Sequence, residues 1–182
     1  MATNKSVFKS LPYDPEADFS PVSLLVNLPM VLVVTNKQKY PTVAALLAAA
    51  KAAPGTITYA TSGDGSPQHL AGLMFEIHAD AKLLHVPYKG GELAVNDALA
   101  GTVDAMFAVM PEALPHIRSG KMTALGVKSP QRSAVLPNVP TMVESGFCGH
   151  KPFRMDRPAG TGQNAKTPHR PAQQRCRCSN GR

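Results

Sequence analysis

The sequence predicts an α/β fold in which short apolar strands alternate with helices around one mostly parallel sheet. The first observation is the alternation itself, which is clearest from about residue 57 to residue 127. The second is the segment YATSGDGSPQHLAG (59–72), where an apolar strand passes through a glycine-rich turn into a helix start. The third is HVPYKGG (85–91), which repeats the order of strand, turn and helix. Consecutive units of this kind build parallel sheets with right-handed crossovers.

The individual elements follow from apolar runs and from the residues that interrupt them. Strands are expected at 22–26 and 31–34, separated by Pro29, and an alanine- and leucine-rich helix at 42–53 ends at Pro54 and Gly55. Further strands are expected near 57–60, 83–86, 103–108 and 123–127. Helices are expected near 66–79, 92–100, 111–119 and 140–145.

The helix expected after residue 65 has the clearest local signals. Ser66 is a favoured N-cap, and Pro67 suits the first helical position because it has no N–H to leave unpaired. Apolar side chains then recur at helical spacing and predict one buried face, formed by Leu70, Leu73, Met74 and Ile77. The opposite face is expected to carry His69, Glu76 and Asp80.

The two glycine-containing turns together predict a binding site for a small anion. Parallel strands place the loops that follow them at one edge of the sheet, where open α/β folds bind ligands. Glycine lets the backbone approach a ligand, and a helix N-terminus offers unpaired N–H donors and partial positive charge. The expected ligand-binding residues are Thr61, Ser62, Gly63, Gly65, Ser66 and His69 in the first unit and Tyr88, Lys89, Gly90 and Gly91 in the second.

Alternatives stay open for these residues. An ordinary strand–helix turn would show the same glycines and serines, and Lys89 alone would equally suit a solvated surface lysine. A dinucleotide fingerprint is excluded because Gln68 stands where its third glycine is required. Neither Ser62 nor Ser66 lies in the G-x-S-x-G motif of serine hydrolases. Asp64 would repel a bound carboxylate, so its side chain is predicted to face solvent.

The sequence shows no pattern that predicts catalysis. We find no paired carboxylates, no nucleophile with a base partner and no metal-ligand spacing, so neither an enzyme nor a metal site is expected in the folded part. His78, His85 and His116 are expected to have structural roles. Asp104 is expected at a strand edge or turn.

Seven segments follow one another along the chain: YDPEADFSPVSLL (13–25), VLVV (31–34), TVAALLAAAKAAPGTITYATSGDGSPQHLAG (42–72), HVPYKGG (85–91), DALAGTVDAMF (97–107), LPHIRSGKMTALGV (114–127) and RSAVLPNVPTMVESGF (132–147). In this order they resemble the Bug family of extracytoplasmic solute receptors, the substrate-binding components of tripartite tricarboxylate transporters. The resemblance is close to continuous from about residue 5 to residue 147.

The resemblance implies a two-lobed α/β binding protein of the periplasmic-binding-protein type II (Venus-flytrap) kind, which closes over a small carboxylate. It implies that loop 61–66 holds the carboxylate through main-chain amides and hydroxyl groups, and that loop 88–91 lines the same cleft. It also implies periplasmic residence, membrane transporter subunits as partners, a monomeric receptor and no cofactor.

Relative to that family, the chain is expected to contain one nearly complete lobe and part of the other. We expect a remnant of the first lobe and the crossover at 1–34, the ligand-binding α/β lobe at 35–127, a return segment toward the first lobe at 128–149 and a basic disordered tail at 150–182. Residues 1–12 show no apolar signal-peptide core, so the chain as written is expected in the cytoplasm.

The formal net charge of +7 comes from residues 150–182. This segment holds eight Lys or Arg residues against Asp156 alone and has no Leu, Ile or Val, which predicts disorder. We consider a shifted reading frame, a basic arm that binds polyanions, and a metal site of His169, Cys176 and Cys178, and we favour the first. The alternative to a receptor is a non-functional gene fragment, or a cytoplasmic domain whose tail binds polyanions. No nucleic-acid binding is expected of the folded part.

Overall fold

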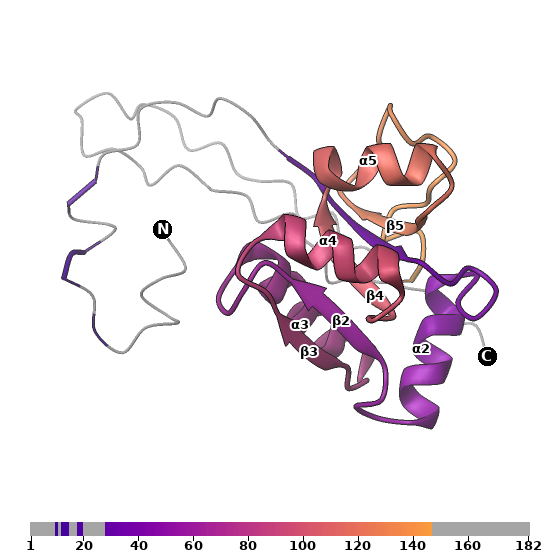
Figure 1. Ribbon diagram of the computed structural model, residues 1–182, viewed down its shortest axis with the longest axis horizontal. Coiled ribbons are helices and arrows are strands. Elements are labelled where there is room, and N and C mark those ends of the chain that lie inside the picture. The colour runs from indigo at the N-terminus through magenta and orange to yellow at the C-terminus, as the bar shows by residue number, and fades with distance from the viewer. Residues whose placement is uncertain (1–9, 11, 15–17, 20–27, 147–182) are drawn as a thin grey trace, which may run out of the picture.

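The computed structural model covers all 182 residues and describes residues 10, 12–14, 18–19 and 28–146 (Figure 1). The strand expected at 22–26 lies outside the described residues. The basic segment 150–182 also lies outside them, together with the three interpretations of it.

Five strands form one sheet in the order β3-β2-β4-β1-β5. Their bounds are β1 (Met30–Val34), β2 (Thr58–Thr61), β3 (Leu84–Pro87), β4 (Ala105–Val109) and β5 (Thr123–Lys128). β2 lies parallel to β3 and β4, whereas β1 pairs antiparallel with β4 and β5. The sheet is therefore mixed, which corrects the mostly parallel sheet predicted above. The Pro29 carbonyl accepts from Met110 N–H at 3.0 Å, so β1 starts where β4 ends and runs back along it.

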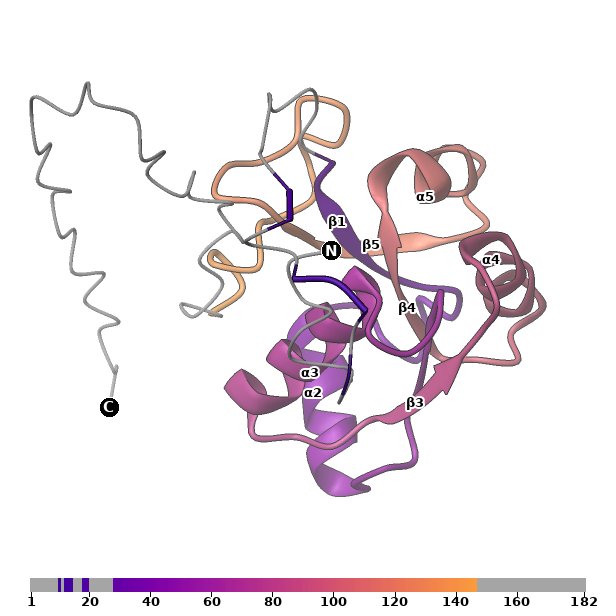
Figure 2. The same ribbon diagram turned by 90° about the vertical axis from the view of Figure 1, so that its left-hand side faces the viewer.

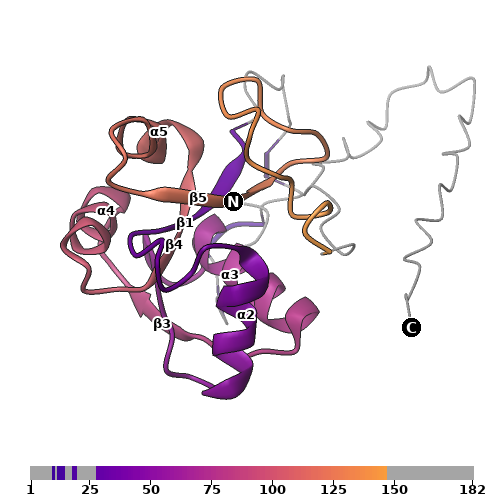
Figure 3. The same ribbon diagram turned by 90° about the vertical axis from the view of Figure 1, so that its right-hand side faces the viewer.

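In the described part of the chain, four helices cover the two faces of this sheet (Figures 2 and 3). They are α2 (Val43–Ala52), α3 (Pro67–Ala79), α4 (Gly91–Ala100) and α5 (Met110–Arg118), at the positions predicted from the sequence. α2 and α3 lie on one face, and α4 and α5 lie on the other. No helix within the described residues combines the length and the apolar character that crossing a bilayer requires.

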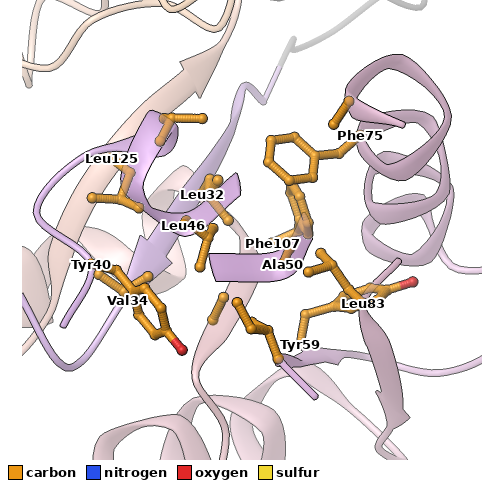
Figure 4. Packing of buried hydrophobic residues seen from close by; sticks show 14 of the residues in the cluster. Leu32, Val34, Tyr40, Leu46, Ala50, Tyr59, Phe75, Leu83, Phe107 and Leu125 are labelled. Carbon is orange, nitrogen blue, oxygen red and sulfur yellow. The ribbon is translucent and has the colours of Figure 1, made fainter. Parts of the chain in front are cut away.

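The core on the α2 and α3 face is built around three aromatic rings (Figure 4). The Phe107 ring on β4 meets Phe75 of α3 at a centroid distance of 5.7 Å and Tyr59 of β2 at 5.9 Å, both edge to face. Leu46 and Ala50 of α2 complete this layer. Smaller side chains fill the other face, with Ala94, Ala98, Ala108 and Ala113 among the buried residues.

The face of α3 that packs against the sheet differs from the prediction. Leu73 is 38% exposed and Ile77 is 76% exposed, while Leu70 and Met74 are only half-buried. The buried residues of this helix are Gln68, Ala71, Gly72, Phe75 and Ala79. A Cβ atom at Gly72 would lie 2.3 Å from a ring carbon of Tyr59, so the helix approaches β2 more closely than large aliphatic side chains would allow.

The helix expected at 140–145 is a second incorrect prediction. The chain there forms turns, and Thr141 pairs with Val127 of β5 in an isolated parallel bridge. Thr141 N–H donates to the Glu144 carboxylate at 2.7 Å, and Glu144 N–H donates to the Thr141 hydroxyl at 3.1 Å. These are the bonds of a helix N-terminal capping box. Here the chain is held against β5 by the bridge, and the pair of bonds closes a turn.

Candidate functional site

The two predicted loops lie side by side at one edge of the sheet. β2 and β3 are paired in parallel with Thr61 opposite Pro87, and Tyr88 N–H continues the ladder by donating to the Thr61 carbonyl at 3.0 Å. A Cβ atom on Gly63, where φ is +128°, would lie 3.2 Å from the Tyr88 carbonyl oxygen. Glycine at position 63 therefore allows the two loops to touch.

The N-terminus of α3 points into this edge, as the sequence predicted. The Ser66 hydroxyl oxygen accepts from His69 N–H at 3.2 Å, which makes Ser66 the N-cap, and Pro67 is the first helical residue. Gln68 N–H donates to no acceptor among the described residues. The Ser66 hydroxyl hydrogen and the main-chain N–H of the buried Gln68 thus have no acceptor in the described part of the chain, and the positive end of the helix dipole lies at the same place.

Other donors of the first loop are already used within the protein. Gly63 N–H donates to the Thr61 hydroxyl at 3.3 Å, and Gly65 N–H donates to Nδ1 of His69 at 3.1 Å. The Ser62 hydroxyl donates to Oε1 of the buried Gln68 side chain at 2.7 Å. Several main-chain and hydroxyl donors of this loop that were expected to bind a ligand therefore donate to acceptors within the protein instead.

A stacked pair of histidines lies directly beside this loop. The rings of His69 on α3 and His85 on β3 have centroids 3.9 Å apart and planes inclined by 12°. Nε2 of His85 is 2.6 Å from the Thr61 hydroxyl. We expected His85 to be structural and did not connect it with His69. The parallel register of β2 and β3 could have shown that His85 lies near the first loop. His85 is paired with Tyr59, and Tyr59 lies only two residues before Thr61, where that loop begins.

Asp64 faces this pair from the loop. Its side chain is 77% exposed, in agreement with the prediction, and Oδ1 lies 3.6 Å from Nδ1 of His85 and 3.9 Å from Nδ1 of His69. Burial lowers the pKa of His85 below its usual range, and the neighbouring His69 lowers it further, while Asp64 opposes both effects. The surroundings of His85 therefore favour the neutral form of its ring.

Asp64, His69 and His85 bring three possible metal ligands within 4.8 Å of one another. However, a histidine nitrogen binds a metal with the lone pair that lies in its ring plane, at about 2.0–2.1 Å for zinc. The two rings are nearly parallel and 3.9 Å apart, so their in-plane lone pairs run parallel to each other and do not converge on one metal position. Nδ1 of His69 also accepts the Gly65 amide already. We therefore assign no metal to this cluster.

The second loop presents fewer free groups than expected. The Tyr88 hydroxyl donates to Asp97 of α4 at 2.8 Å, so it is turned away from the first loop toward the helix. Lys89 is exposed, and Gly90 is the N-cap of α4, with a φ of +140° and no side-chain cap. A Cβ atom on Gly91 would lie 2.9 Å from a carboxylate oxygen of Glu112. Sequence reasoning missed Glu112, whose negative charge makes the start of α4 less favourable for an anion than the start of α3.

The chain matches the Tripartite tricarboxylate transporter family receptor family over residues 1–172. Protein BugT of Bordetella pertussis is 41% identical over 147 residues, which are 81% of this chain and 45% of BugT. The periplasmic binding protein BugD is 34% identical with a TM-score of 0.75, over 81% of this chain and 50% of BugD.

The structure of MatC from Rhodopseudomonas palustris with bound malate is 29% identical with a TM-score of 0.72, over 80% of this chain and 49% of MatC. The chain thus spans about half the length of these relatives. The two structural matches confirm the predicted α/β fold of the periplasmic-binding-protein kind, and the coverage agrees with one lobe and part of another.

Proposed function

Because the chain belongs to the tripartite tricarboxylate transporter receptor family, we propose that it serves in a periplasmic receptor for a small organic carboxylate. The receptor would act as a monomer and deliver its ligand to the membrane subunits of the transporter. The malate bound to MatC supports a dicarboxylate as the ligand class. The alternative of a polyanion-binding tail depends on residues outside the described part of the chain, and no observation on the described residues favours it.

The observation that carries this proposal is the pair of donors that have no protein acceptor at the start of α3, the Ser66 hydroxyl and the Gln68 main-chain N–H. A carboxylate placed there would accept from the Ser66 hydroxyl and Gln68 N–H, with Lys89 supplying a positive charge from the neighbouring loop. Hydrogen bonds to a charged group contribute about 1.5–3 kcal/mol each. Two or three such bonds, together with closure over the ligand, would support micromolar affinity, which corresponds to about −8 kcal/mol.

Calorimetric titration of the full chain with malate, succinate and citrate tests the proposal. Ser66→Ala should weaken the best-bound acid by tenfold or more, because it removes a donor to the ligand as well as a helix cap. Thr42→Ala is the matched control. Thr42 caps α2 in the same way, accepting from Ala45 N–H at 3.1 Å, but α2 follows the antiparallel β1 and so starts at the opposite edge of the sheet.

Both substitutions should cost about 1 kcal/mol of stability, while only Ser66→Ala should change the dissociation constant. Lys89→Ala should weaken binding by a smaller factor, and the exposed Lys82, at the far end of β3, provides its control. If none of the three acids binds at millimolar concentration, or if Ser66→Ala and Thr42→Ala weaken binding equally, the proposal fails.

A further inference from the structure

The stacked histidines give the anion site a group that can gain a positive charge. We infer that carboxylate binding at this site is coupled to uptake of one proton by the His69–His85 pair. The inference rests on the proposed function and adds its regulation, namely that affinity rises as the pH falls toward the acidic side of neutral.

His69 is the group through which a proton would act on the loop. Since the Gly65 amide is a donor, Nδ1 of His69 must accept and carries no proton in this arrangement. A proton placed on Nδ1 would break that bond. The Gly65 N–H would then be released toward the ligand, and the new Nδ1–H would be a second donor. One protonation therefore adds two donors and a positive charge at the start of α3.

His85 limits the pair to one charge. Its ring lies 3.9 Å from the His69 ring, and like charges at this distance repel each other, so the second imidazole stays neutral when the first is protonated. His85 also contacts the Thr61 hydroxyl through Nε2, and its other nitrogen is directed toward Asp64. The pair therefore carries at most one added proton, on one ring or the other.

The surroundings of His85 favour its neutral form until a ligand arrives. The loop contributes Asp64, whose carboxylate is largely exposed to water, and β2 contributes Tyr59, whose ring lies 5.1 Å from His85 and whose pKa is raised by burial. Within the described part of the chain, Asp64 is the negative group that opposes the burial of His85 and the effect of its neighbour. A bound carboxylate would supply the second negative charge that makes the protonated pair stable.

Titration with malate at several pH values between 5.5 and 8.0 tests this coupling. For one proton, linkage limits the change in affinity to about tenfold per pH unit. The heat of binding measured at one pH in two buffers with different ionisation enthalpies gives the number of protons taken up, expected to approach one.

Two variants separate the pair from the titration of malate itself. His69→Asn keeps an acceptor for the Gly65 amide but cannot be protonated, and His85→Gln keeps a polar partner for Thr61. His69→Asn should remove the pH dependence and leave the weaker affinity seen at pH 8. His85→Gln removes the neighbouring imidazole but keeps His69, so the pH dependence should persist and begin at a higher pH. His78→Asn, an exposed position in the last turn of the same helix, should leave the pH dependence intact.

Four outcomes decide the matter. Stronger binding at low pH that is lost in His69→Asn and kept in His85→Gln supports the inference; loss in neither variant overturns it. Binding that has the same affinity and no proton uptake across this range overturns the inference and leaves the proposed receptor function standing. No binding of malate, succinate or citrate at any of these pH values overturns both.

Discussion

Replacing Asp104 with alanine would remove a carboxylate whose hydrogen bonds join three segments at the N-terminal end of β4. Oδ1 accepts from Lys39 Nζ at 2.9 Å and from the Tyr40 hydroxyl at 3.1 Å. Oδ2 accepts from the Thr58 amide at 3.1 Å and from the Thr58 hydroxyl at 3.0 Å. The carboxylate therefore joins the start of β2 and the loop before α2 to β4.

The cost follows from which donors lose their partner. Tyr40 is 2% exposed and Thr58 is half-buried, so their donors cannot all reach water when the carboxylate is removed. An unsatisfied buried donor costs about 1–3 kcal/mol, and we expect Asp104→Ala to lose about 3 kcal/mol in total. Lys39→Ala removes only a side chain that is 57% exposed, for which about 0–1 kcal/mol is expected.

The pH dependence gives a second measure of the same group. Burial by itself would raise the pKa of Asp104, but hydrogen bonds from Lys39, Thr58 and Tyr40 outweigh it and hold the pKa below the usual range. A lowered pKa in the folded state means that the stabilisation is present above the unfolded-state pKa of about 4 and is lost as the pH falls below it. The difference between wild type and Asp104→Ala should therefore shrink at low pH.

Urea unfolding at pH 7 and at pH 3 would measure both effects, with Lys39→Ala as the matched control. The reasoning is refuted if Lys39→Ala costs as much as Asp104→Ala, because the exposed ion pair would then carry the energy. It is also refuted if the deficit of Asp104→Ala is equally large at both pH values.

Four further substitutions test the packing of α3 against β2. Phe75→Ala should cost about 3–5 kcal/mol in urea unfolding, whereas Ile77→Ala should stay within about 0.5 kcal/mol because the side chain is 76% exposed; similar losses would contradict the observed helix face. Gly72→Ala should destabilise by about 1–3 kcal/mol despite the better helix propensity of alanine, and a raised melting temperature would show that the helix can move off the sheet. Tyr59→Phe should stabilise by about 1 kcal/mol, since the buried hydroxyl of Tyr59 has no partner among the described residues; a lower melting temperature would reveal a bound water.

Local signals account for the parts of the fold that were predicted correctly. The start of α3 was predicted because Ser66 and Pro67 act on their own neighbours, and the strand positions follow from short apolar runs. The direction of β1 was not predictable in this way. Its antiparallel pairing depends on where residues 28–29 reach the sheet, and no local pattern reports that position.

The buried face of α3 shows why large apolar residues at helical spacing did not identify the side that packs against the sheet. Small residues at positions 71, 72 and 79 let the helix settle onto β2, and Phe75 alone supplies the bulk. The large aliphatic side chains then remain on the outer side. The Tyr59 ring beneath the helix determines that a small residue is needed at position 72, because it leaves no room there for a Cβ atom. Tyr59 lies 13 residues before Gly72 and on a different element, so the sequence of α3 alone does not reveal this requirement.

The candidate site was predicted as a pair of loops, but their internal bonds were not. The contact of Gly63 with the Tyr88 carbonyl follows from the parallel register, which sequence patterns indicated. The stacking of His69 on His85 joins residues 16 positions apart on a helix and a strand, and periodicity carries no information about that contact. The roles of the ten predicted ligand-binding residues stay predictions until a ligand is bound, as do the domain boundaries.

The position of β1 has a consequence for cutting the chain. β1 separates β4 from β5, with five residues paired on each side. A chain that began at residue 35 would expose two strand edges about 10 Å apart, the spacing that one inserted strand fills. A free peptide with the sequence MVLVV would complete both ladders at once by strand addition. The fold could thus be split into the peptide MVLVV and a larger fragment that starts at residue 35. With each part fused to a different protein, reassembly of the sheet would report that the two proteins have come into contact.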